Sequence, residues 1–288
     1  MAEQLNVPFA VAGWPAADID VTPANQPVVE LGRNRLNQLL HRFSVTGRNW
    51  TGSGPAALRS SHLHISYWSS SWYTGIELGK QTVHVGGKAK SIDLDRVDSA
   101  TLDSTSAALL NIEEITELPW VFITLGTSFT DDVNFFIAAS HAAEALGAVP
   151  ILALGGRPDH QTMAQLNAKA ARSSVLVDRV NFDYILPMVG ASIHHGGAGT
   201  THAMVTHAVP QIVVPHAADQ MHQAHGVSRS GVGVGIRPQH VSVEALAQIL
   251  EEMLVEDSGF QLNARSIQNE FAGLGGVEKA ATLLTQIT

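Results

Sequence analysis

The residues best suited to chemistry lie in one short stretch, residues 193–201, which reads Ile-His-His-Gly-Gly-Ala-Gly-Thr-Thr. An apolar run ends at Ile193, and three glycines follow within four positions. This order predicts a strand, a glycine turn and the start of a helix. Glycines let backbone N–H groups approach a ligand closely, and the first turn of a helix offers unpaired donors and a positive dipole end. The stretch therefore predicts an anion site, with phosphate as the expected ligand.

A phosphate at this site would have few cationic partners. No lysine or arginine occurs between Ile193 and Ser228, so amide N–H groups, hydroxyl groups and His195 would have to hold it. Hydrogen bonds to a charged group contribute about 1.5–3 kcal/mol each, and three or four of them are enough for a diphosphate. The alternative is a glycine turn that only lets a strand pack on a helix. The His-His-Gly-Gly sequence taken alone leaves both interpretations open.

The elements that must position this stretch are predicted by continuous apolar runs, which are typical of strands buried on both faces. Such runs occupy residues 120–125, 150–154, 174–177, 191–193 and 211–214. Between them, Val133, Phe136 and Ile137 have helical spacing, and Met163, Leu166 and Ala170 follow it more weakly. Alternating strands and helices predict an α/β fold with a doubly wound parallel sheet. Ligands of such sheets collect at the carboxyl ends of the strands, where residues 126–128 (Gly-Thr-Ser) follow the first run.

Residues 1–116 show a weaker pattern. Short apolar runs at 7–12, 63–67 and 82–85 predict strands, and the leucines of 36–43 have helical spacing. Aromatic residues also gather here, namely Trp14, Trp50, Tyr67, Trp68, Trp72 and Tyr73. They either line a pocket for an apolar acceptor or fill a core, and we interpret most of them as core.

The composition excludes several classes of function. The chain of 288 residues is 45% apolar and 15% charged, as in a globular protein, and its net charge of -9 argues against nucleic acid as a partner. It has no cysteine, no run long enough to span a membrane and no signal peptide at the start, so we expect a cytoplasmic protein. Residues 231–235 (Gly-Val-Gly-Val-Gly) lack the helix and acidic residue of a dinucleotide fingerprint and predict a tight loop into a short strand.

The stretch from Ile193 to Gln220 as a whole resembles the donor-binding motif of the GT-B glycosyltransferases of family 1, which include macrolide, flavonoid, sterol and glucuronosyl transferases. In that family a His, a glycine-rich turn and a Ser/Thr hold the diphosphate of a nucleotide sugar. The resemblance implies diphosphate contacts from His195, Gly197, Gly199, Thr200, Gly126 and Thr127. It also implies that Asp219 and Gln220 bind the sugar hydroxyls.

The resemblance covers residues 118–288 and implies two domains. Residues 117–288 would be the nucleotide-sugar domain, and residues 1–116 a truncated, Rossmann-like portion of the acceptor domain. Where many relatives have an aromatic residue and a proline that contact the base, this chain has residues 178–181 (Asp-Arg-Val-Asn), so Arg179 and Val180 are the predicted base contacts. Uridine diphosphate is the commonest nucleotide in the family and thymidine diphosphate the next. No cofactor and no metal are expected, although His222 and His225 have a spacing that one helix face could use for a metal.

The function implied is an inverting transfer of a hexose from a nucleotide sugar, with a UDP-sugar as the expected donor, to a hydroxyl of a small-molecule or lipid acceptor. By the resemblance the catalytic base would precede Met1, and His62, His64 and His84 do not match its position, so the catalytic residue is unknown. The alternative is a nucleotide-sugar-binding module that is inactive alone and needs a partner chain for the acceptor half. A partner chain or a homo-oligomer is therefore among the expected assemblies.

Overall fold

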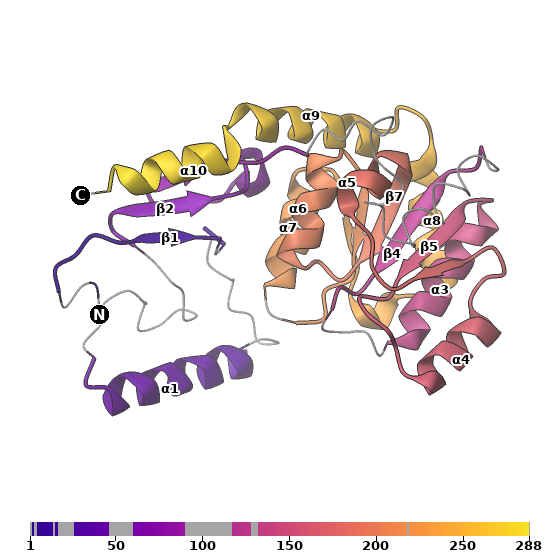
Figure 1. Cartoon of the computed structure of the whole chain (residues 1–288), viewed down its shortest axis with the longest axis horizontal. Helices are drawn as coiled ribbons and strands as arrows, with labels where there is room; N and C mark the ends of the chain where they lie inside the picture. The colour runs from indigo at the N-terminus through magenta and orange to yellow at the C-terminus, as the bar shows by residue number, and fades with distance from the viewer. Residues whose placement is uncertain are drawn as a thin grey trace, which may run out of the picture. The chain divides into compact units, whose positions relative to one another are not determined.

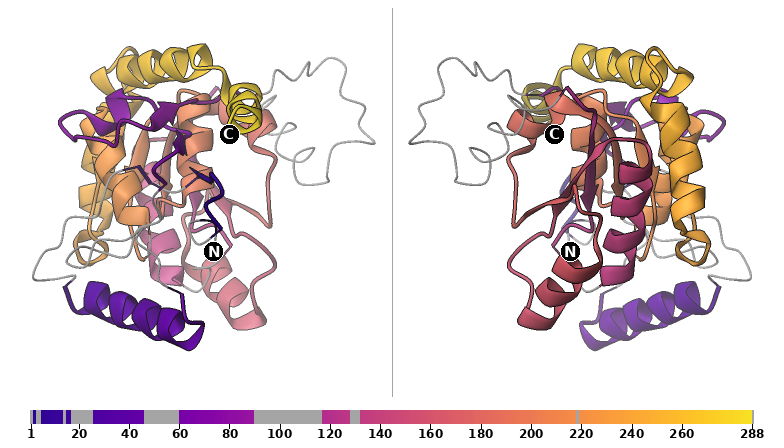
Figure 2. Two further views of the ribbon diagram at one scale, coloured as in Figure 1. Left: turned by 90° about the vertical axis from the view of Figure 1, so that its left-hand side faces the viewer. Right: turned by 90° about the vertical axis from the view of Figure 1, so that its right-hand side faces the viewer.

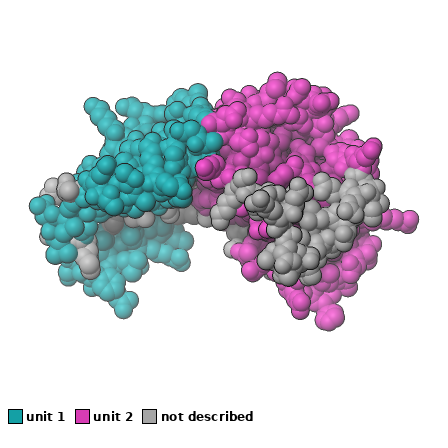
Figure 3. Space-filling view, turned by 45° about the horizontal axis from the view of Figure 1, so that its top comes forward, with its two compact units in different colours: residues 1–87, 270–288 teal, residues 88–269 magenta. Residues whose placement is uncertain are grey.

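The computed structural model describes residues 2, 5–13, 15–16, 26–45, 60–89, 117–127, 132–217 and 219–287. The chain forms two compact units, which Figure 3 distinguishes by colour: residues 1–87 with 270–288, and residues 88–269. The sequence places residues 270–288 in the second domain, whereas the compact units group them with the first. The predicted boundary between residues 116 and 117 adjoins a segment outside the described residues.

The second unit contains a six-stranded sheet in which every strand pairs in parallel (Figure 1). Its strands are β4 (Trp120–Thr124), β5 (Val149–Ala153), β6 (Val175–Val177), β7 (Val189–His194), β8 (Gln211–Val213) and β9 (Gly233–Gly235). Their order in the sheet is β6-β5-β4-β7-β8-β9. The chain thus runs outward from β4 in one direction and from β7 in the other, as in a doubly wound fold. The predicted parallel sheet is confirmed.

Helices follow these strands (Figures 1 and 2). They are α3 (Val133–Ala145), α4 (His160–Lys169), α5 (Phe182–Ile185), α6 (Ala198–Thr206), α7 (Gln220–Arg229), α8 (Val243–Leu254) and α9 (Gly259–Gly273). Short polar side chains cap the starts of several of them; for example, Asp132 accepts a hydrogen bond from Phe135 N, Asp159 from Thr162 N and Ser242 from Ala245 N. Such caps satisfy N–H groups that have no partner within the helix.

The side chains of β4 alternate between two hydrophobic clusters. Val121 and Ile123 join the cluster that contains Phe136 of α3 and Leu250 of α8. Trp120 and Phe122 join the cluster that contains residues of α5 and α6. Because helices cover both faces, every residue of β4 and β5 is buried, which is why their sequences are continuous apolar runs.

The first unit has a smaller sheet of three parallel strands, β1 (Ala10–Ala12), β2 (Leu63–Ser66) and β3 (Thr82–His84), in that order. The helix α10 (Gly276–Thr285) adds Ala280 and Leu283 to the core formed by this sheet. Gly276 N donates to Val85 O at 2.7 Å, which ties the start of the helix to the end of β3. The strands predicted at 7–12, 63–67 and 82–85 are therefore present, each shorter than its apolar run.

The aromatic residues of this unit pack into its core. Trp68 and Trp72 are stacked with ring centroids 4.3 Å apart, and Phe271 packs against both edge to face. Trp68, Trp72 and Tyr73 are buried, which agrees with their interpretation as core, whereas Trp14 and Trp50 lie outside the described residues.

The predicted helix around residues 36–43 is α1 (Gln26–Arg42). Among the described helices, none combines the length and the apolar character needed to cross a bilayer.

Candidate functional site

The loops that follow β4 and β7 meet at the carboxyl edge of the larger sheet. The two strands are neighbours, with Thr124 paired with His194, so Gly126 and His195 lie side by side. A Cβ on Gly126 would be only 2.7 Å from His195 Cε1, and one on Gly197 only 2.5 Å from His195 Nε2. The imidazole of His195 is therefore held between two glycines, and any larger residue at either position would displace it. The resemblance implied that these loops meet, and the structure brings them together.

A third loop, after β5, completes this edge. Gly155 has φ of +76°, and a Cβ there would overlap Gly126 O. The side chain of Thr124 donates to Ala153 O at 2.8 Å and accepts from Gly126 N at 3.1 Å. These contacts hold the end of β4 against the end of β5 and fix the turn that carries Gly126.

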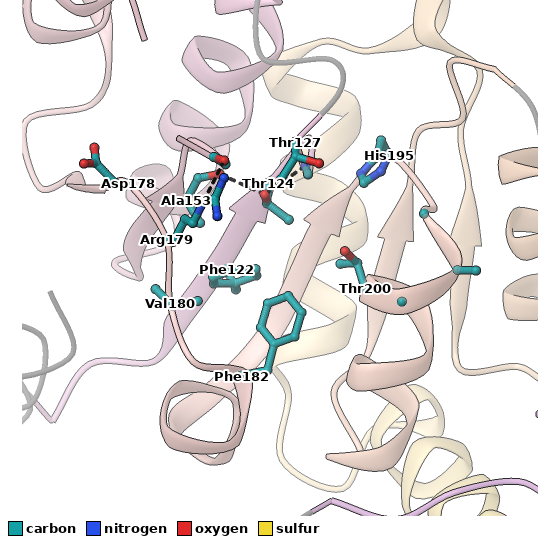
Figure 4. A pocket seen from close by; sticks show the side chains of 15 residues that line it. Phe122, Thr124, Thr127, Ala153, Asp178, Arg179, Val180, Phe182, His195 and Thr200 are labelled. Carbon is teal, nitrogen blue, oxygen red and sulfur yellow. Dashed lines mark hydrogen bonds between the residues drawn. The ribbon is translucent and has the colours of Figure 1, made fainter. Parts of the chain in front are cut away.

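These three loops and the loop after β6 surround a cavity of about 410 Å³ (Figure 4). It is lined by Phe122, Thr124, Gly126, Thr127, Ala153, Gly155, Asp178, Arg179, Val180, Phe182, His195, Gly197, Ala198, Gly199 and Thr200. It lies between the two halves of the sheet, where the strand order reverses, which is the usual ligand position in such folds. All the residues predicted to contact the diphosphate and the base line it.

One end of the cavity is rich in hydrogen-bond donors. Helix α6 begins there, and its N-cap is Gly197, which has no side chain to bond the first-turn N–H groups. The N–H groups of a first helical turn have no partner within the helix and carry the positive end of its dipole. Together with the hydroxyls of Thr127 and Thr200, they form a site that suits an anion.

The other end of the cavity is aromatic. Phe122 and Phe182 make an edge-to-face contact with centroids 5.8 Å apart, and Figure 4 shows them on the side of Val180, away from His195. Arg179 donates from Nε to Gly155 O at 3.1 Å. Sequence reasoning missed both phenylalanines, because a fully apolar strand hides which of its residues faces a cavity, and because Phe182 belongs to a four-residue helix too short to show periodicity.

Burial lowers the pKa of His195, and the neighbouring His216 lowers it further, whereas the backbone of Thr124 and the carboxylate of Asp219 act in the opposite direction. With its pKa below 6.5, the imidazole is mostly neutral at pH 7, so it offers the site a hydrogen-bonding group rather than a cation.

Asp219 and Gln220 lie beside the glycine turn but do not line the cavity. The carbonyl oxygen of Gln220 would be 3.2 Å from a Cβ on Gly196. Its side-chain Oε1 accepts from His216 N at 2.7 Å and from Ala217 N at 2.9 Å. In this structure the amide oxygen of Gln220 thus supports the loop before α7, and its role in sugar binding stays a prediction, as does that of Asp219.

The remaining histidines form no metal centre within the described ranges, where no cluster of three or more His, Cys, Asp or Glu side chains could hold an ion. Of the three N-terminal histidines considered above, His84 has its Nδ1 2.7 Å from Trp68 O and His64 is buried. Neither arrangement suggests a catalytic base, and we assign none.

Known proteins with related sequences are glycosyltransferases. Residues 141–276 match the family model "Erythromycin biosynthesis protein CIII-like, C-terminal domain". Erythronolide mycarosyltransferase of Saccharopolyspora erythraea is 38% identical over 95 residues, which are 33% of this chain and 23% of that protein. O-mycaminosyltylonolide 6-deoxyallosyltransferase of Streptomyces fradiae is 31% identical over 169 residues, which are 58% of this chain and 38% of that protein. The chain thus matches less than half the length of these relatives.

Solved structures show the same fold over nearly the whole chain. The glycosyltransferase of kitacinnamycin superimposes with a TM-score of 0.70 at 18% identity, covering 99% of this chain and 71% of the other. Glycosyltransferase SsfS6 of Streptomyces sp. SF2575, solved with thymidine diphosphate, gives a TM-score of 0.60 at 21% identity, covering 99% and 65%. The matches do not favour a module that only binds a nucleotide sugar, since each protein named here is a transferase. The resemblance of this chain to the GT-B glycosyltransferases of family 1 is confirmed: residues 141–276 match the C-terminal domain of such an enzyme, and nearly the whole chain has their fold.

Proposed function

We propose that the cavity between β4 and β7 binds the nucleoside diphosphate part of a sugar donor. The observation that carries this proposal is the division of one cavity into a donor-rich end, with His195 and the start of α6, and an aromatic end, with Phe122 and Phe182. The first matches a diphosphate and the second a planar base. Preorganised donors of this kind also stabilise charge that develops on a leaving group.

The proposed reaction transfers a hexose with inversion. An acceptor hydroxyl attacks the anomeric carbon, the new C–O bond forms on the face opposite the diphosphate, and the bond from the anomeric carbon to the diphosphate oxygen breaks. The electron pair leaves with the nucleoside diphosphate, where His195, Thr200, Thr127 and the amides of the turn bind it. The hydroxyl proton goes to a base for which the described residues offer no assignment. No cofactor and no metal take part in this scheme.

The proposed nucleotide carries uridine or thymidine. The resemblance suggests uridine diphosphate first, whereas the solved relative SsfS6 contains thymidine diphosphate. Val180 would offer backbone groups to the base, and Arg179 a guanidinium plane. The proposed acceptor is the hydroxyl of a small molecule, in line with the antibiotic transferases that this chain resembles, or of a lipid.

Calorimetric titration with uridine diphosphate and thymidine diphosphate tests the proposal. His195→Ala should weaken binding at least tenfold, because a hydrogen bond to a charged group contributes about 1.5–3 kcal/mol. His240→Ala is the matched control, since His240 is exposed and does not line the cavity. Equal affinity of the His195→Ala variant and the wild-type protein for the bound nucleotide would refute the assignment.

A further inference from the structure

The histidine that precedes His195 is fully buried and uses both ring nitrogens. His194 is the last residue of β7. Its Nδ1 accepts a hydrogen bond from Gly196 N at 3.0 Å, so this nitrogen carries no proton. The proton therefore resides on Nε2, which donates to Gln211 Oε1 at 2.9 Å on the adjacent strand β8. One tautomer and one ring orientation satisfy both contacts.

The charge state of His194 is also fixed. Burial lowers its pKa to about 3, although the bond to Gln211 acts in the opposite direction. The ring is therefore neutral at any pH at which the protein would work, and Nδ1 is always available as an acceptor.

The bond to Gly196 holds the first residue of the glycine turn in a conformation that favours glycine. Gly196 has φ of +86°, and a Cβ there would be 2.6 Å from Val213 Cγ1. Its N–H group points into the protein at His194, while His195, one residue earlier, lines the cavity. The two consecutive histidines thus have different roles. His194 holds the glycine turn by accepting a hydrogen bond from Gly196 N, and His195 lines the cavity.

Stability alone does not account for a polar pair at this depth. The neighbours Ile193 and Ile212 are apolar, and both His194 and Gln211 are fully buried. Gln211 Nε2 is buried and finds no hydrogen-bond partner within the described part of the chain. Leaving such a group unsatisfied destabilises the folded state, so an apolar pair would give a more stable core. The polar pair provides a hydrogen-bond acceptor for Gly196 N, namely Nδ1 of His194.

We propose that His194, held by Gln211, is the positioning residue of the diphosphate-binding turn. By holding Gly196, it orients the N–H groups of the first turn of α6 and fixes the position of His195. The inference rests on the proposed function, because its effect is measured as affinity for a nucleoside diphosphate.

Two substitutions separate the two bonds of the ring. In His194→Asn the side-chain oxygen takes a place near that of Nδ1 and can accept from Gly196 N. In His194→Gln the longer amide reaches the place of Nε2 and can donate to Gln211, but leaves Gly196 N without its acceptor. Both remove the imidazole, and both are neutral. Each variant and the wild-type protein are titrated with uridine and thymidine diphosphates, and their Tm values are measured alongside.

We expect His194→Gln to weaken nucleotide binding about tenfold or more and His194→Asn to stay within about threefold of the wild-type protein, although both lower Tm. Rescue by asparagine is the result that a purely structural role would not give. Equal affinities of the two variants, or losses that simply follow Tm, would overturn the inference and leave the proposed function intact. If the wild-type protein binds neither nucleotide, the proposed function itself fails.

Gln211→Leu tests the same arrangement from the other strand. It removes the acceptor of His194 Nε2–H together with the unsatisfied amide nitrogen, so one unsatisfied buried N–H group replaces another and Tm should fall only modestly. The ring keeps its bond to Gly196 N but loses the contact that fixes its orientation, and we expect nucleotide affinity to fall about threefold or more. An unchanged affinity would contradict a positioning role.

Discussion

At the scale of single residues, the site depends on the absence of a side chain at two glycines. Gly126 and Gly197 approach the imidazole of His195 from two sides, so that a Cβ on either would lie within 2.7 Å of it. Their importance to the site is therefore steric, in addition to the backbone contacts that the resemblance implies. The sequence shows the glycines but not the contact between Gly126 and the ring of His195, because those two residues are about seventy positions apart.

Gly197→Ala tests this arrangement directly. Gly197 has φ of −60° and ψ of 136°, which alanine adopts without strain, so the change acts through the contact with His195 Nε2. We expect the Kd for a nucleoside diphosphate to rise about tenfold with little change in Tm, because moving the ring costs one hydrogen bond to a charged group. Gly156→Ala, where a Cβ would meet no atom within 4 Å, is the control. A similar affinity for both variants would show that the ring can shift without consequence.

The buried His194 predicts how stability changes with pH. The ordinary pKa is 6.5 and the folded-state value about 3. Below pH 6.5 the unfolded chain binds a proton at this residue and the folded chain does not. This group therefore lowers the free energy of unfolding by about 1.4 kcal/mol for each unit by which the pH is lowered from 6.5 towards 3. Denaturant unfolding at pH 7 and pH 5 should show a smaller loss for His194→Asn than for the wild-type protein. Parallel losses would contradict this prediction.

At the scale of elements, each unit is organised by loops at strand ends. In the smaller sheet, the loop after β3 carries Gly86 with φ of +59°, and a Cβ there would overlap Phe271 O. Gly87 N donates to the same carbonyl at 3.3 Å, and Lys279 Nζ donates to His84 O at 3.1 Å. These contacts join the end of β3 to residues nearly two hundred positions later in the chain.

Gly86→Ala should therefore destabilise the first unit more than a positive φ alone explains. Gly75 is the matched control, since its φ is +80° but a Cβ there meets no atom within 4 Å. We expect Gly75→Ala to cost about 1–2 kcal/mol of unfolding free energy, the usual penalty of a left-handed residue, and Gly86→Ala clearly more because backbone atoms must move. Thermal unfolding measures both. Equal shifts in Tm would show that the backbone at Phe271, near the end of α9, adjusts easily.

At the scale of the whole molecule, the two compact units differ in whether one or two segments of the chain form them. The larger comes from one continuous segment, whereas the smaller joins residues 1–87 to residues 270–288. Its core depends on Ala280 and Leu283 of α10 as much as on Leu63 and Ile65 of β2. A change in the last helix should therefore affect the first strands and spare the cavity, which lies wholly in the larger unit.

Ala280→Asp tests this organisation. Ala280 is 4% exposed, so an unpaired carboxylate there should cost about 3 kcal/mol or more. We expect early unfolding of the first unit, reported by the fluorescence of the buried Trp68 and Trp72, while nucleotide affinity stays within about twofold. Val277→Asp, at a position 64% exposed on the same helix, is the control. A parallel loss of nucleotide binding in Ala280→Asp would show that the units do not behave independently.

The sequence by itself determined the local features of this protein. Continuous apolar runs predicted the ends of the parallel strands to within about two residues, as for the run at 211–214 against β8. The order of glycines and threonines after Ile193 predicted the turn and α6. These features depend on burial and backbone freedom, which neighbouring residues encode.

Only the tertiary structure decided what depends on contacts between distant residues. It placed His195 between Gly126 and Gly197, added Phe122 and Phe182 to the cavity, and turned the side-chain oxygen of Gln220 toward the backbone at residues 216 and 217. It also gave His194 its two partners. Sequence spacing cannot supply these contacts, because the pairing of parallel strands brings together loops whose separation along the chain carries no signal of their distance in space.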